Sequence, residues 1–312
     1  MPAAMPQISV IVGAQNARST IVECLRALNA QAGEAQAEII VADGSSDGSA
    51  ELVAAEFPQL TLLRGDPRSL VPQLWRLGLD RARGPIVAFT IAHCVPADDW
   101  LRQILAAHGD GAAGVGGPID APSEGSAVDW ALYFARYSAY LPPAEHSKSE
   151  ATRRVVDEIP GDNAAYKRAT LELCQREMRD GFWETLVHVR LRAEGETLAM
   201  IPTMRVRLAA AAGKDGAGDR SLLATAGLRF RHGRHYGSTR PGSTTAVRLV
   251  RLAASPLIVP TLLARIAGRV QRGQPGWLPQ LRRALPALLV LLTAWAIGEA
   301  SGYLLPQRRE WP

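Results

Sequence analysis

The sequence predicts an α/β domain followed by a helical, membrane-associated C-terminal region. Over the first 120 residues, short apolar runs alternate with amphipathic runs, which is the pattern of parallel β-α-β units. The composition, with 47% hydrophobic and 21% charged residues, suits a folded protein and excludes a disordered one. The most apolar stretches lie in the last third of the chain, together with the surplus of positive charge.

The apolar runs of the first part are expected to form strands over residues 8–12, 38–42, 60–63 and 85–90, and the first of these is expected to be buried. The segments between them are expected to form helices with one apolar face, over residues 19–30, 50–56 and 69–81. In a parallel sheet, ligands bind beyond the carboxyl ends of the strands. The turns that follow these strands are therefore where a binding site is expected.

Charge is divided unevenly along the chain. Residues 201–312 carry 17 Lys and Arg against 4 Asp and Glu, a net charge of +13, whereas residues 1–200 carry a net charge of −8. Because the basic surplus coincides with the most apolar stretches, a membrane surface is the expected partner. Nucleic acid is not expected, since the sequence contains no recognisable nucleic-acid-binding module.

Two C-terminal segments are expected to contact lipid. Residues 284–305 contain a single charge, Glu299, and are long enough to span a bilayer as a transmembrane or deeply inserted helix. A buried helix of a soluble domain is the alternative. Within residues 246–270 the longest uncharged run has 13 residues, which is too short to span, so an interfacial or re-entrant segment is expected.

The three cysteines and the N-terminus indicate the compartment. Cys24, Cys94 and Cys174 form no CxxC pair, and the first residues lack the basic and apolar regions of a secretory signal. The α/β domain is therefore expected on the cytoplasmic side of the cell (inner) membrane. The expected divisions are the α/β domain over residues 1–212, a basic linker over 213–245 and a membrane-associated helical region over 246–312.

Acidic residues follow two of the expected strands. Residues 9–16 read Ser-Val-Ile-Val-Gly-Ala-Gln-Asn, and residues 38–49 read Glu-Ile-Ile-Val-Ala-Asp-Gly-Ser-Ser-Asp-Gly-Ser. This order resembles the opening of the family-2 glycosyltransferases of the GT-A fold. The resemblance implies a mixed central sheet that binds a nucleotide-diphospho-sugar, with Asp43 on the nucleotide and Asn16 and Asp47 beside it. Without the resemblance, Asp43 and Asp47 would be ordinary turn and cap residues.

The end of the fourth strand departs from the family pattern. The family places an Asp-x-Asp motif there, which coordinates Mg²⁺ or Mn²⁺ at the donor diphosphate, but this chain has Ile91-Ala92-His93. Three interpretations stay open. His93 binds Mn²⁺, or it donates a hydrogen bond to the diphosphate in a metal-independent reaction, or the protein is an inactive relative.

Two later segments resemble the acceptor side of the family's site. Residues 160–168 are similar to its acceptor-side strand, which implies that Asp162 and Asn163 lie near the acceptor or the diphosphate; a turn entering a strand is the alternative. Residues 181–195 are similar to the helix that carries the general base, which places Glu184 in that role and Trp183 against the acceptor. The alternative is that Glu184 is an ordinary acid at the N-terminus of a helix, where the helix dipole stabilises its negative charge.

Residues 229–240 concentrate Arg, His and Tyr, similar to a basic motif that follows the catalytic domain of membrane glycosyltransferases. Arg231 and Arg234 are expected to bind a diphosphate or a lipid phosphate through their forked guanidinium groups; contact with lipid headgroups is equally compatible. The whole resemblance implies inverting transfer of a sugar to a hydroxyl of a lipid-linked or polysaccharide acceptor. A membrane-anchored pseudo-enzyme that binds a nucleotide-sugar or a partner without turnover is the alternative.

Overall fold

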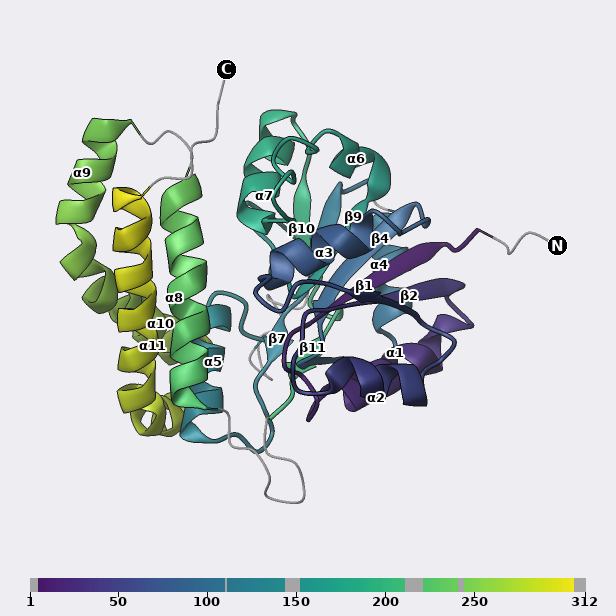
Figure 1. The fold of residues 1–312 in the computed structure, drawn as a ribbon, viewed down its shortest axis with the longest axis horizontal. Coiled ribbons are helices and arrows are strands. Elements are labelled where there is room, and N and C mark those ends of the chain that lie inside the picture. The colour runs from purple at the N-terminus through teal and green to yellow at the C-terminus, as the bar shows by residue number, and fades with distance from the viewer. Residues whose placement is uncertain (1–4, 110, 144–151, 211–220, 241–243, 306–312) are drawn as a thin grey trace. The chain divides into compact units, whose positions relative to one another are not determined.

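The computed structural model describes residues 5–109, 111–143, 152–210, 221–240 and 244–305. It consists of two compact units (Figure 1). The first is formed by Met1–Ala121 and Tyr140–Ala209, and the second by Pro122–Ala139 and Ala210–Pro312. The expected boundary between residues 212 and 213 lies outside the described residues.

The first unit is built on an eight-stranded mixed sheet with the order β3-β2-β1-β4-β9-β6-β10-β8. Strands β1 to β4 are mutually parallel where they pair, β9 runs antiparallel between β4 and β6, and β8 runs antiparallel at the edge. The mixed α/β sheet confirms the predicted fold class. The strands are β1 (Ile8–Ala14), β2 (Ala37–Asp43), β3 (Thr61–Arg64), β4 (Ile86–Ile91), β6 (Gly114–Gly116), β8 (Arg154–Val156), β9 (Asn163–Lys167) and β10 (Leu198–Met200).

The register of the central strands brings their carboxyl ends to one edge. Strand β1 is buried along its whole length, since it lies between β2 and β4 and consists almost entirely of small and β-branched apolar residues. Ala14 pairs with Asp43, and Gly13 pairs with Ile91. The turns after β1, β2 and β4 therefore meet at the edge where the sequence predicted a binding site.

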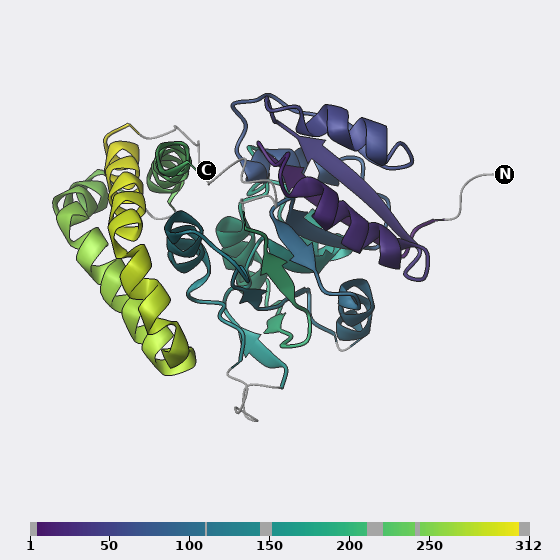
Figure 2. The ribbon, with the colours of Figure 1, turned by 90° about the horizontal axis from the view of Figure 1, so that it is seen from below.

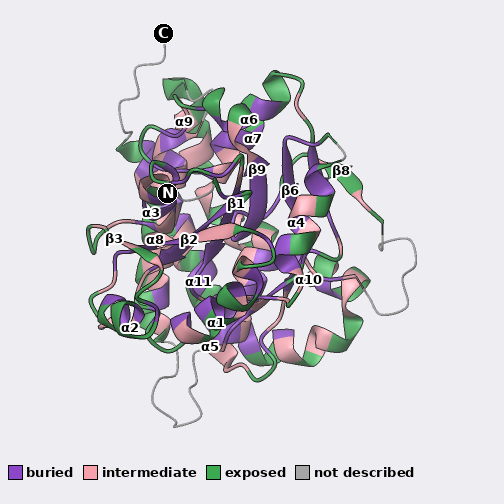
Figure 3. Ribbon diagram, turned by 90° about the vertical axis from the view of Figure 1, so that its right-hand side faces the viewer, coloured by how far each residue is buried: buried purple, intermediate pink, exposed green. Residues whose placement is uncertain are grey.

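Six helices accompany this sheet: α1 (Ile21–Ala32), α2 (Ser49–Glu56), α3 (Val71–Leu79), α4 (Trp100–His108), α6 (Arg168–Glu172) and α7 (Glu184–Ala193). An aromatic cluster fills the space between the sheet and α3. Phe89 stacks on Phe182 with 4.0 Å between ring centroids, and Trp75 and Tyr166 meet both rings edge-on. Figure 3 shows β1, β6 and β9 in the colour of buried residues.

A second, three-stranded sheet has the order β5-β11-β7. Its strands are β5 (Cys94–Pro96), β7 (Ile119–Asp120) and β11 (Val206–Leu208). Since β5 follows β4 almost directly, this small sheet fixes the turn that contains His93. The carbonyl oxygen of His93 accepts a hydrogen bond of 2.8 Å from the backbone N–H of Ala209, just after β11.

The second unit is helical. Its elements are α5 (Ala127–Tyr137), α8 (Leu222–Thr239), α9 (Thr245–Ala253), the short 3₁₀ segments Ser255–Leu257 and Pro275–Trp277, α10 (Ile258–Gly273) and α11 (Leu278–Leu304). α10 and α11 lie side by side, as Figure 2 shows. The aromatic residues of α5 form core: Tyr133 and Phe134 are fully buried, and Tyr133 lies edge-on to Trp277.

The compact units differ from the expected divisions at two places. α8 occupies most of residues 213–245, which were expected to be a linker, and residues 122–139 group with the C-terminal unit through contacts of α5 with α11. Arginine and histidine interrupt the apolar pattern of α8, so periodicity does not identify it as a helix. Its stability comes from close packing on α11, which the apolar periodicity of α8 does not reveal.

One helix in the described part of the chain, Pro275–Leu304, is long and apolar enough to cross a membrane, with a mean hydropathy of 1.6 over an 18-residue window. It contains the expected segment 284–305 except its last residue. α9 and the helical stretch Ser255–Gly273 pass the same test only as a pair, bent by 50°. This bend lies within residues 246–270, where a straight spanning helix was not expected.

Candidate active site

The turns after β1 and β2 are joined by hydrogen bonds. Asn16 has a left-handed backbone conformation, with φ of 49°, and its side-chain oxygen accepts a 3.0 Å hydrogen bond from the backbone N–H of Ser46. Its own N–H donates to the Ser45 hydroxyl at 2.8 Å. Asn is among the residues that tolerate this conformation. The result is one continuous rim formed by two turns that lie about 30 residues apart in the sequence.

Asp47 extends this rim. One of its carboxylate oxygens accepts from the N–H and hydroxyl of Ser49, and the other accepts from the N–H of Arg18 at 3.1 Å. Burial alone would raise the pKa of Asp47, but these hydrogen bonds outweigh it and hold the pKa below its usual value. Asp47 therefore stays ionised and ties the start of α2 to the turn before α1.

Asp43 is the last residue of β2 and lies under the rim. Its carboxylate accepts hydrogen bonds of 2.9 Å from both the N–H and the hydroxyl of Ser45, and an Arg64 nitrogen lies 3.8 Å away. The side chain has 0% exposure, whereas that of Arg64 is 54% exposed. A nucleotide can therefore reach this carboxylate only if Ser45 or Arg64 moves.

His93 lies in the turn between β4 and β5. Its ring nitrogen Nδ1 is 2.9 Å from the hydroxyl of Thr20, which precedes α1. Ile91 and Ala92, which stand where the family has its first acid and its middle residue, are buried. Among the described residues, no group of three or more His, Cys, Asp or Glu side chains is placed to hold a metal ion. Of the two acids that follow in the sequence, Asp98 and Asp99, the second is bonded to Gln103 and Arg102.

A divalent ion held by carboxylates therefore does not fit this turn. Hard ions such as Mg²⁺ require several oxygen ligands, and the turn offers one imidazole and no carboxylate. A single imidazole is at most one ligand of a softer ion such as Mn²⁺. The remaining ligands of such an ion would have to come from the diphosphate and water.

Glu184 begins α7 and faces the turn that enters β9. A methyl group added at Gly161 would lie 3.1 Å from the Glu184 carboxyl carbon and 3.2 Å from the ring of Trp75. The Trp75 indole nitrogen donates a buried hydrogen bond of 2.8 Å to the carbonyl of Thr90, near the end of β4. The structure thus brings Glu184, Gly161 and Trp75 together beside the ligand edge of the sheet.

Trp75 also reaches the end of β1. A Cβ atom at Gly13 would lie 3.0 Å from the indole nitrogen. One indole therefore connects the first strand of the predicted donor site to the predicted base. Trp75 belongs to no recognised motif. The one signal in the sequence is a tryptophan on the apolar face of α3, three residues after Pro72, and this is equally typical of core packing.

The three acceptor-side residues are all largely buried. Asn163 has no exposure: its side chain accepts from the Trp100 indole at 2.8 Å and donates to the carbonyls of Pro118 and Met204 at 3.0 and 2.8 Å. This amide fastens β9 to the loops around the small sheet and so holds its neighbour Asp162, itself 3% exposed. Trp183 is 9% exposed and directly precedes Glu184.

A buried pair lies behind the predicted base. The Tyr166 hydroxyl is 2.7 Å from Nε2 of His188, one helical turn after Glu184. Burial lowers the pKa of His188 to about 3 and, together with the charge of Glu184, raises the pKa of Tyr166. Both groups are therefore neutral at physiological pH, so neither adds charge beside Glu184.

Arg231 and Arg234 lie on α8 of the second unit, and both are exposed. The other predicted site residues all belong to the first unit. Gly298 and Gly302 of α11 pack against the backbone of Arg234, which leaves its side chain on the outer surface of this helix pair.

The fold and the arrangement at the ligand edge define a GT-A-like nucleotide-sugar transferase domain. The sequence matches the family Glycosyl transferase family 2 over residues 9–173, more than half of the chain, and the chain belongs to this family. Glycosyltransferase AglE of Haloferax volcanii is 29% identical over 137 residues. That match covers 41% of this chain and 45% of AglE, so the chain matches less than half of this relative.

Two solved structures are similar to this chain. The mannosyltransferase PcManGT from Pyrobaculum calidifontis, solved with GDP-Man and Mn²⁺, has a TM-score of 0.50 at 19% identity, over 96% of this chain and 88% of that one. Residues 1–349 of S. aureus TarS give a TM-score of 0.46 at 15% identity, over 92% and 90%. At such identities, the likeness to the mannosyltransferase shows a common fold and carries no further statement about substrate or metal.

Proposed function

We propose that this protein transfers a sugar, with inversion, from a nucleotide-diphospho-sugar to a hydroxyl of a lipid-linked or polysaccharide acceptor. The observation that carries the proposal is the position of Glu184. Its carboxylate faces Gly161 and Trp75, beside the edge at which β1, β2 and β4 end. A carboxylate next to the nucleotide edge of such a sheet is suited to act on a hydroxyl that attacks the sugar.

The donor binds over the rim of the β1 and β2 turns. In this proposal, Asp43 accepts hydrogen bonds from the nucleotide after Ser45 or Arg64 moves aside, and Asn16 and Asp47 keep the rim in place. The existing bonds of Asn16 to Ser46 and of Asp47 to Arg18 and Ser49 support the framing role. The energetic reason is pre-organisation, because a rim that is already bonded loses little entropy when the donor binds.

The transfer itself is a single displacement. As the acceptor oxygen attacks the anomeric carbon, Glu184 takes its proton, the bond from the sugar to the diphosphate breaks, and the nucleoside diphosphate leaves. One displacement inverts the anomeric configuration and needs no covalent sugar–enzyme intermediate. Gly161 leaves space beside the carboxylate, and Trp183 and Asp162 line the acceptor side. Asn163 positions Asp162 rather than touching the acceptor, because its side chain is buried and bonded.

Charge develops on the departing diphosphate and has to be stabilised. Because Ile91-Ala92-His93 lacks carboxylates, no step is assigned to a protein-held metal. We assign the first contact to His93 as a hydrogen-bond donor. Arg231 and Arg234, on the second unit, stay predicted to bind a diphosphate or a lipid phosphate. Guanidinium groups suit a diphosphate because they donate paired hydrogen bonds.

A membrane location is part of the same proposal. Helix Pro275–Leu304 can cross a bilayer by length and composition, and exposed apolar side chains such as Val250 and Leu257 lie on the helices of the same unit. We propose that the second unit anchors the protein in the inner membrane with the transferase domain, residues 1–212, on the cytoplasmic face. A lipid-linked acceptor would then be presented at the surface that the anchor occupies.

The test of the base is Glu184→Gln, which keeps the size of the side chain and removes its basicity. We expect nucleotide binding to stay within about 2-fold and transfer to fall about 100- to 1,000-fold. Glu194→Gln is the matched control, since Glu194 caps the other end of α7 and pairs with Arg190 at the surface. Intact transfer in the Glu184→Gln protein would contradict the assignment.

The test of the diphosphate site is calorimetric titration of the detergent-purified protein with UDP and GDP, each with Mn²⁺ and with EDTA. Binding that survives EDTA and weakens in His93→Ala supports direct contact from His93. Binding that requires Mn²⁺ and is lost in His93→Ala makes His93 a metal ligand instead. Binding that His93→Ala leaves unchanged removes His93 from the site.

A membrane-anchored pseudo-enzyme is the second candidate. The loss of both metal-binding acids at Ile91 and His93, and the complete burial of the Asp43 side chain, favour it. It predicts nucleotide or partner binding without transfer under any metal condition. Replacing both positions by Asp would then create Mn²⁺ affinity without creating transfer.

A further inference from the structure

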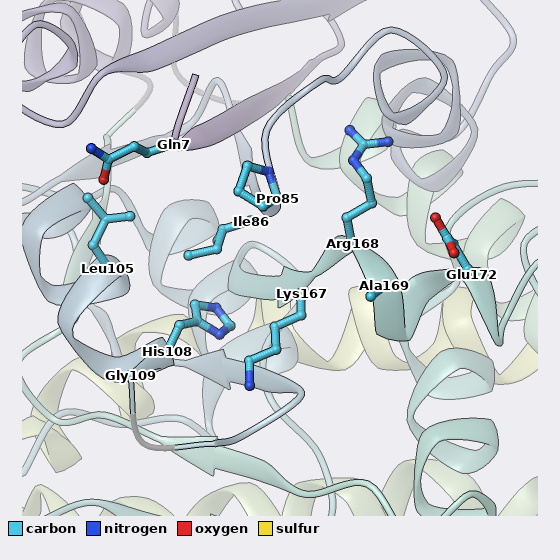
Figure 4. A pocket seen from close by; sticks show the side chains of 10 residues that line it. All are labelled: Gln7, Pro85, Ile86, Leu105, His108, Gly109, Lys167, Arg168, Ala169 and Glu172. Atoms are coloured by element: carbon cyan, nitrogen blue, oxygen red, sulfur yellow. The ribbon is translucent and has the colours of Figure 1, made fainter. Parts of the chain in front are cut away.

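Two features of the molecule have no part in the proposed reaction. The first is a hollow of about 690 Å³ at the amino-terminal edge of the parallel strands, drawn in Figure 4. In it the guanidinium group of Arg168 points away from Lys167 and His108, so these basic side chains do not converge on one ligand. The second is the apolar surface of the helical unit, where exposed aliphatic side chains lie on α9 and on α11.

One face of α11 is exposed and uncharged over about three turns. Pro286, Leu289, Val290 and Ile297 are all exposed. Positions three, four and seven residues apart lie on one face of a helix, so these side chains form a single stripe. The sequence has no acidic or basic residue over 284–298. The stripe therefore has the composition of a surface that contacts lipid.

The exposed arginines of α8 can be placed along α11 because the two helices are parallel. A Cβ atom at Gly298 would lie 2.2 Å from the carbonyl oxygen of Phe230, and one at Gly302 would lie 2.3 Å from that of Arg234. Both helices therefore advance by four residues between these contacts. Arg231, which follows Phe230 and is exposed, lies at about the level of Gly298.

Basic residues thus bound the apolar stripe at both ends, since Arg282 and Arg283 are exposed at the start of α11. Gly298 follows Arg283 by 15 residues, which is roughly 22 Å at a helical rise of about 1.5 Å per residue. The hydrocarbon core of a bilayer is about 30 Å thick. The two charged levels are therefore too close together to reach opposite surfaces, and charged side chains inside the hydrocarbon are costly.

The helices before α11 show the same limit. The uncharged run between Arg251 and Arg265 has 13 residues, which is roughly 20 Å of helix. The helices that contain it, α9 and Ser255–Gly273, are bent by 50° relative to each other, which shortens their reach further. Two helical passes of this unit therefore carry charge at both ends of an apolar length that is shorter than a bilayer.

The charge of these helices suits an anionic surface. Residues 244–305 contain seven arginines and one acidic residue, Glu299, which is buried. Leu249, Val250 and Leu257 are exposed on α9 and on the 3₁₀ segment that follows it. Helices that combine exposed aliphatic side chains with arginines lie along the surface of an anionic leaflet rather than across it.

We propose that the second unit is held in one leaflet of an anionic membrane and does not cross it. α11 lies along the surface with its apolar stripe in the hydrocarbon. The arginines at both of its ends face the headgroups of the same leaflet, on the side of the membrane that holds the transferase domain. This inference rests on the membrane location proposed above and specifies its geometry.

Cysteine labelling with a membrane-impermeant maleimide tests this topology. Arg231→Cys and Arg283→Cys place thiols at the two ends of the stripe, and Arg26→Cys places one on the exposed surface of α1 in the first unit. The three native cysteines are buried, so the unsubstituted full-length protein gives the background. Sealed vesicles are prepared from membranes of the expressing cells with the cytoplasmic face outward.

We expect both thiols at the ends of α11 to be labelled in sealed vesicles, to within about 2-fold of Arg26→Cys, because thiol reactivity follows exposure. A spanning α11 would leave one of the two unlabelled until detergent opens the vesicles. That result would overturn the inference and leave the membrane location intact. If Arg283→Cys fails to fold, Arg282→Cys places the thiol at the same end of the helix.

A second measurement tests the stripe itself. Binding of the purified full-length protein to preformed vesicles of phosphatidylcholine and phosphatidylglycerol should weaken about 10-fold in Val290→Glu, since a charge would enter the hydrocarbon. Val155→Glu is the matched control, because Val155 is exposed on β8 of the first unit, and it should bind as the unsubstituted protein does.

The outcomes separate this inference from the proposed function. Equal vesicle binding of Val290→Glu and Val155→Glu would show that the stripe does not contact lipid, and would overturn the inference alone. A protein that associates neither with cell membranes nor with these vesicles would overturn the proposed membrane location as well. Sugar transfer by the same preparations tests the proposed reaction independently of both.

Discussion

Two glycine sites, one in each compact unit, serve different purposes. In the second unit, Cβ atoms added at Gly237 and Gly298 would lie 2.2 Å from backbone oxygens of the facing helix, those of Glu299 and Phe230. In the first unit, a Cβ at Gly161 would meet side chains, at 3.1 Å from Glu184 and 3.2 Å from Trp75. The helix pair therefore needs glycine so that two backbones can touch, whereas the candidate active site needs it to leave room beside a carboxylate.

The α8–α11 crossing has the spacing of a known helix-packing pattern. Gly233 and Gly237 are four residues apart on α8, as are Gly298 and Gly302 on α11, and all four would place a Cβ within 2.4 Å of the partner's backbone. Small residues at this spacing let helices approach closely, most often within membranes. This packing explains how an arginine-rich segment is held as a helix.

The strongest test of the comparison is Gly237→Ala in α8. The added methyl group collides with a backbone carbonyl, which cannot turn aside, so we expect a loss of about 3 kcal/mol in the free energy of unfolding. Gly227→Ala is the matched control on the same helix, because nothing lies within 4 Å of its Cβ position. That substitution should stabilise the helix by up to about 1 kcal/mol.

Thermal unfolding of the detergent-solubilised protein, followed by circular dichroism, measures both variants. Opposite signs for the same chemical change, 10 residues apart in one helix, would establish the close crossing. A Gly237→Ala protein as stable as the wild type would show that α8 does not pack on α11 in this way.

The second test concerns the first unit. Gly161→Ala places a methyl group against Glu184 and Trp75, both side chains that can give by a few tenths of an ångström. We expect little change in stability but about a 10-fold loss of transfer, since catalysis is sensitive to small displacements of a reacting group. Gly33→Ala, at a position with nothing within 4 Å, is the control. An unchanged transfer rate alongside a lower unfolding temperature would make Gly161 a packing residue only.

These contrasts also show which features a sequence can predict. The strands β1, β2 and β4 are predictable because each contains a continuous apolar run followed by turn residues. The approach of Trp75 to both Gly13 and Gly161 is not, since it depends on how α3 lies across two strands that are distant in the chain. Similarly, α8 has no apolar stripe of its own, and its helical structure is stabilised by packing on α11.

Glu299 is the clearest case of tertiary structure overriding a sequence rule. A carboxylate weakens the expectation of an inserted helix, yet this one is 6% exposed and accepts hydrogen bonds from the Trp295 indole at 2.9 Å and the Tyr303 hydroxyl at 2.5 Å. An Arg240 nitrogen lies 3.6 Å away. Buried charges persist where they are paired and hydrogen-bonded. Trp295 and Tyr303 lie four residues before and four residues after Glu299 on the same helix, so the sequence could predict these two contacts. It could not predict the contact with Arg240, which comes from another helix.

The smallest expected loss of stability is at Gly48. The cost of a side chain there comes neither from crowding against backbone nor from loss of space for a ligand. Gly48 has φ of 84°, and the only close neighbour of an added Cβ is the flexible end of Arg18, at 2.6 Å. Gly48→Ala should cost about 1 kcal/mol, from the left-handed conformation alone. Gly48→Asn should cost less, because Asn tolerates that conformation.

Unfolding temperatures of the two Gly48 variants separate conformation from crowding. If backbone conformation determines the stability, the Gly48→Ala protein unfolds at a lower temperature than the Gly48→Asn protein, although Ala is smaller. If contact with Arg18 determines it, the Gly48→Asn protein unfolds at the lower temperature, because Asn is larger. Since Gly48 follows Asp47 and precedes α2, the same proteins should also bind UDP slightly less tightly in the order of their backbone strain, which would link this turn to the donor rim.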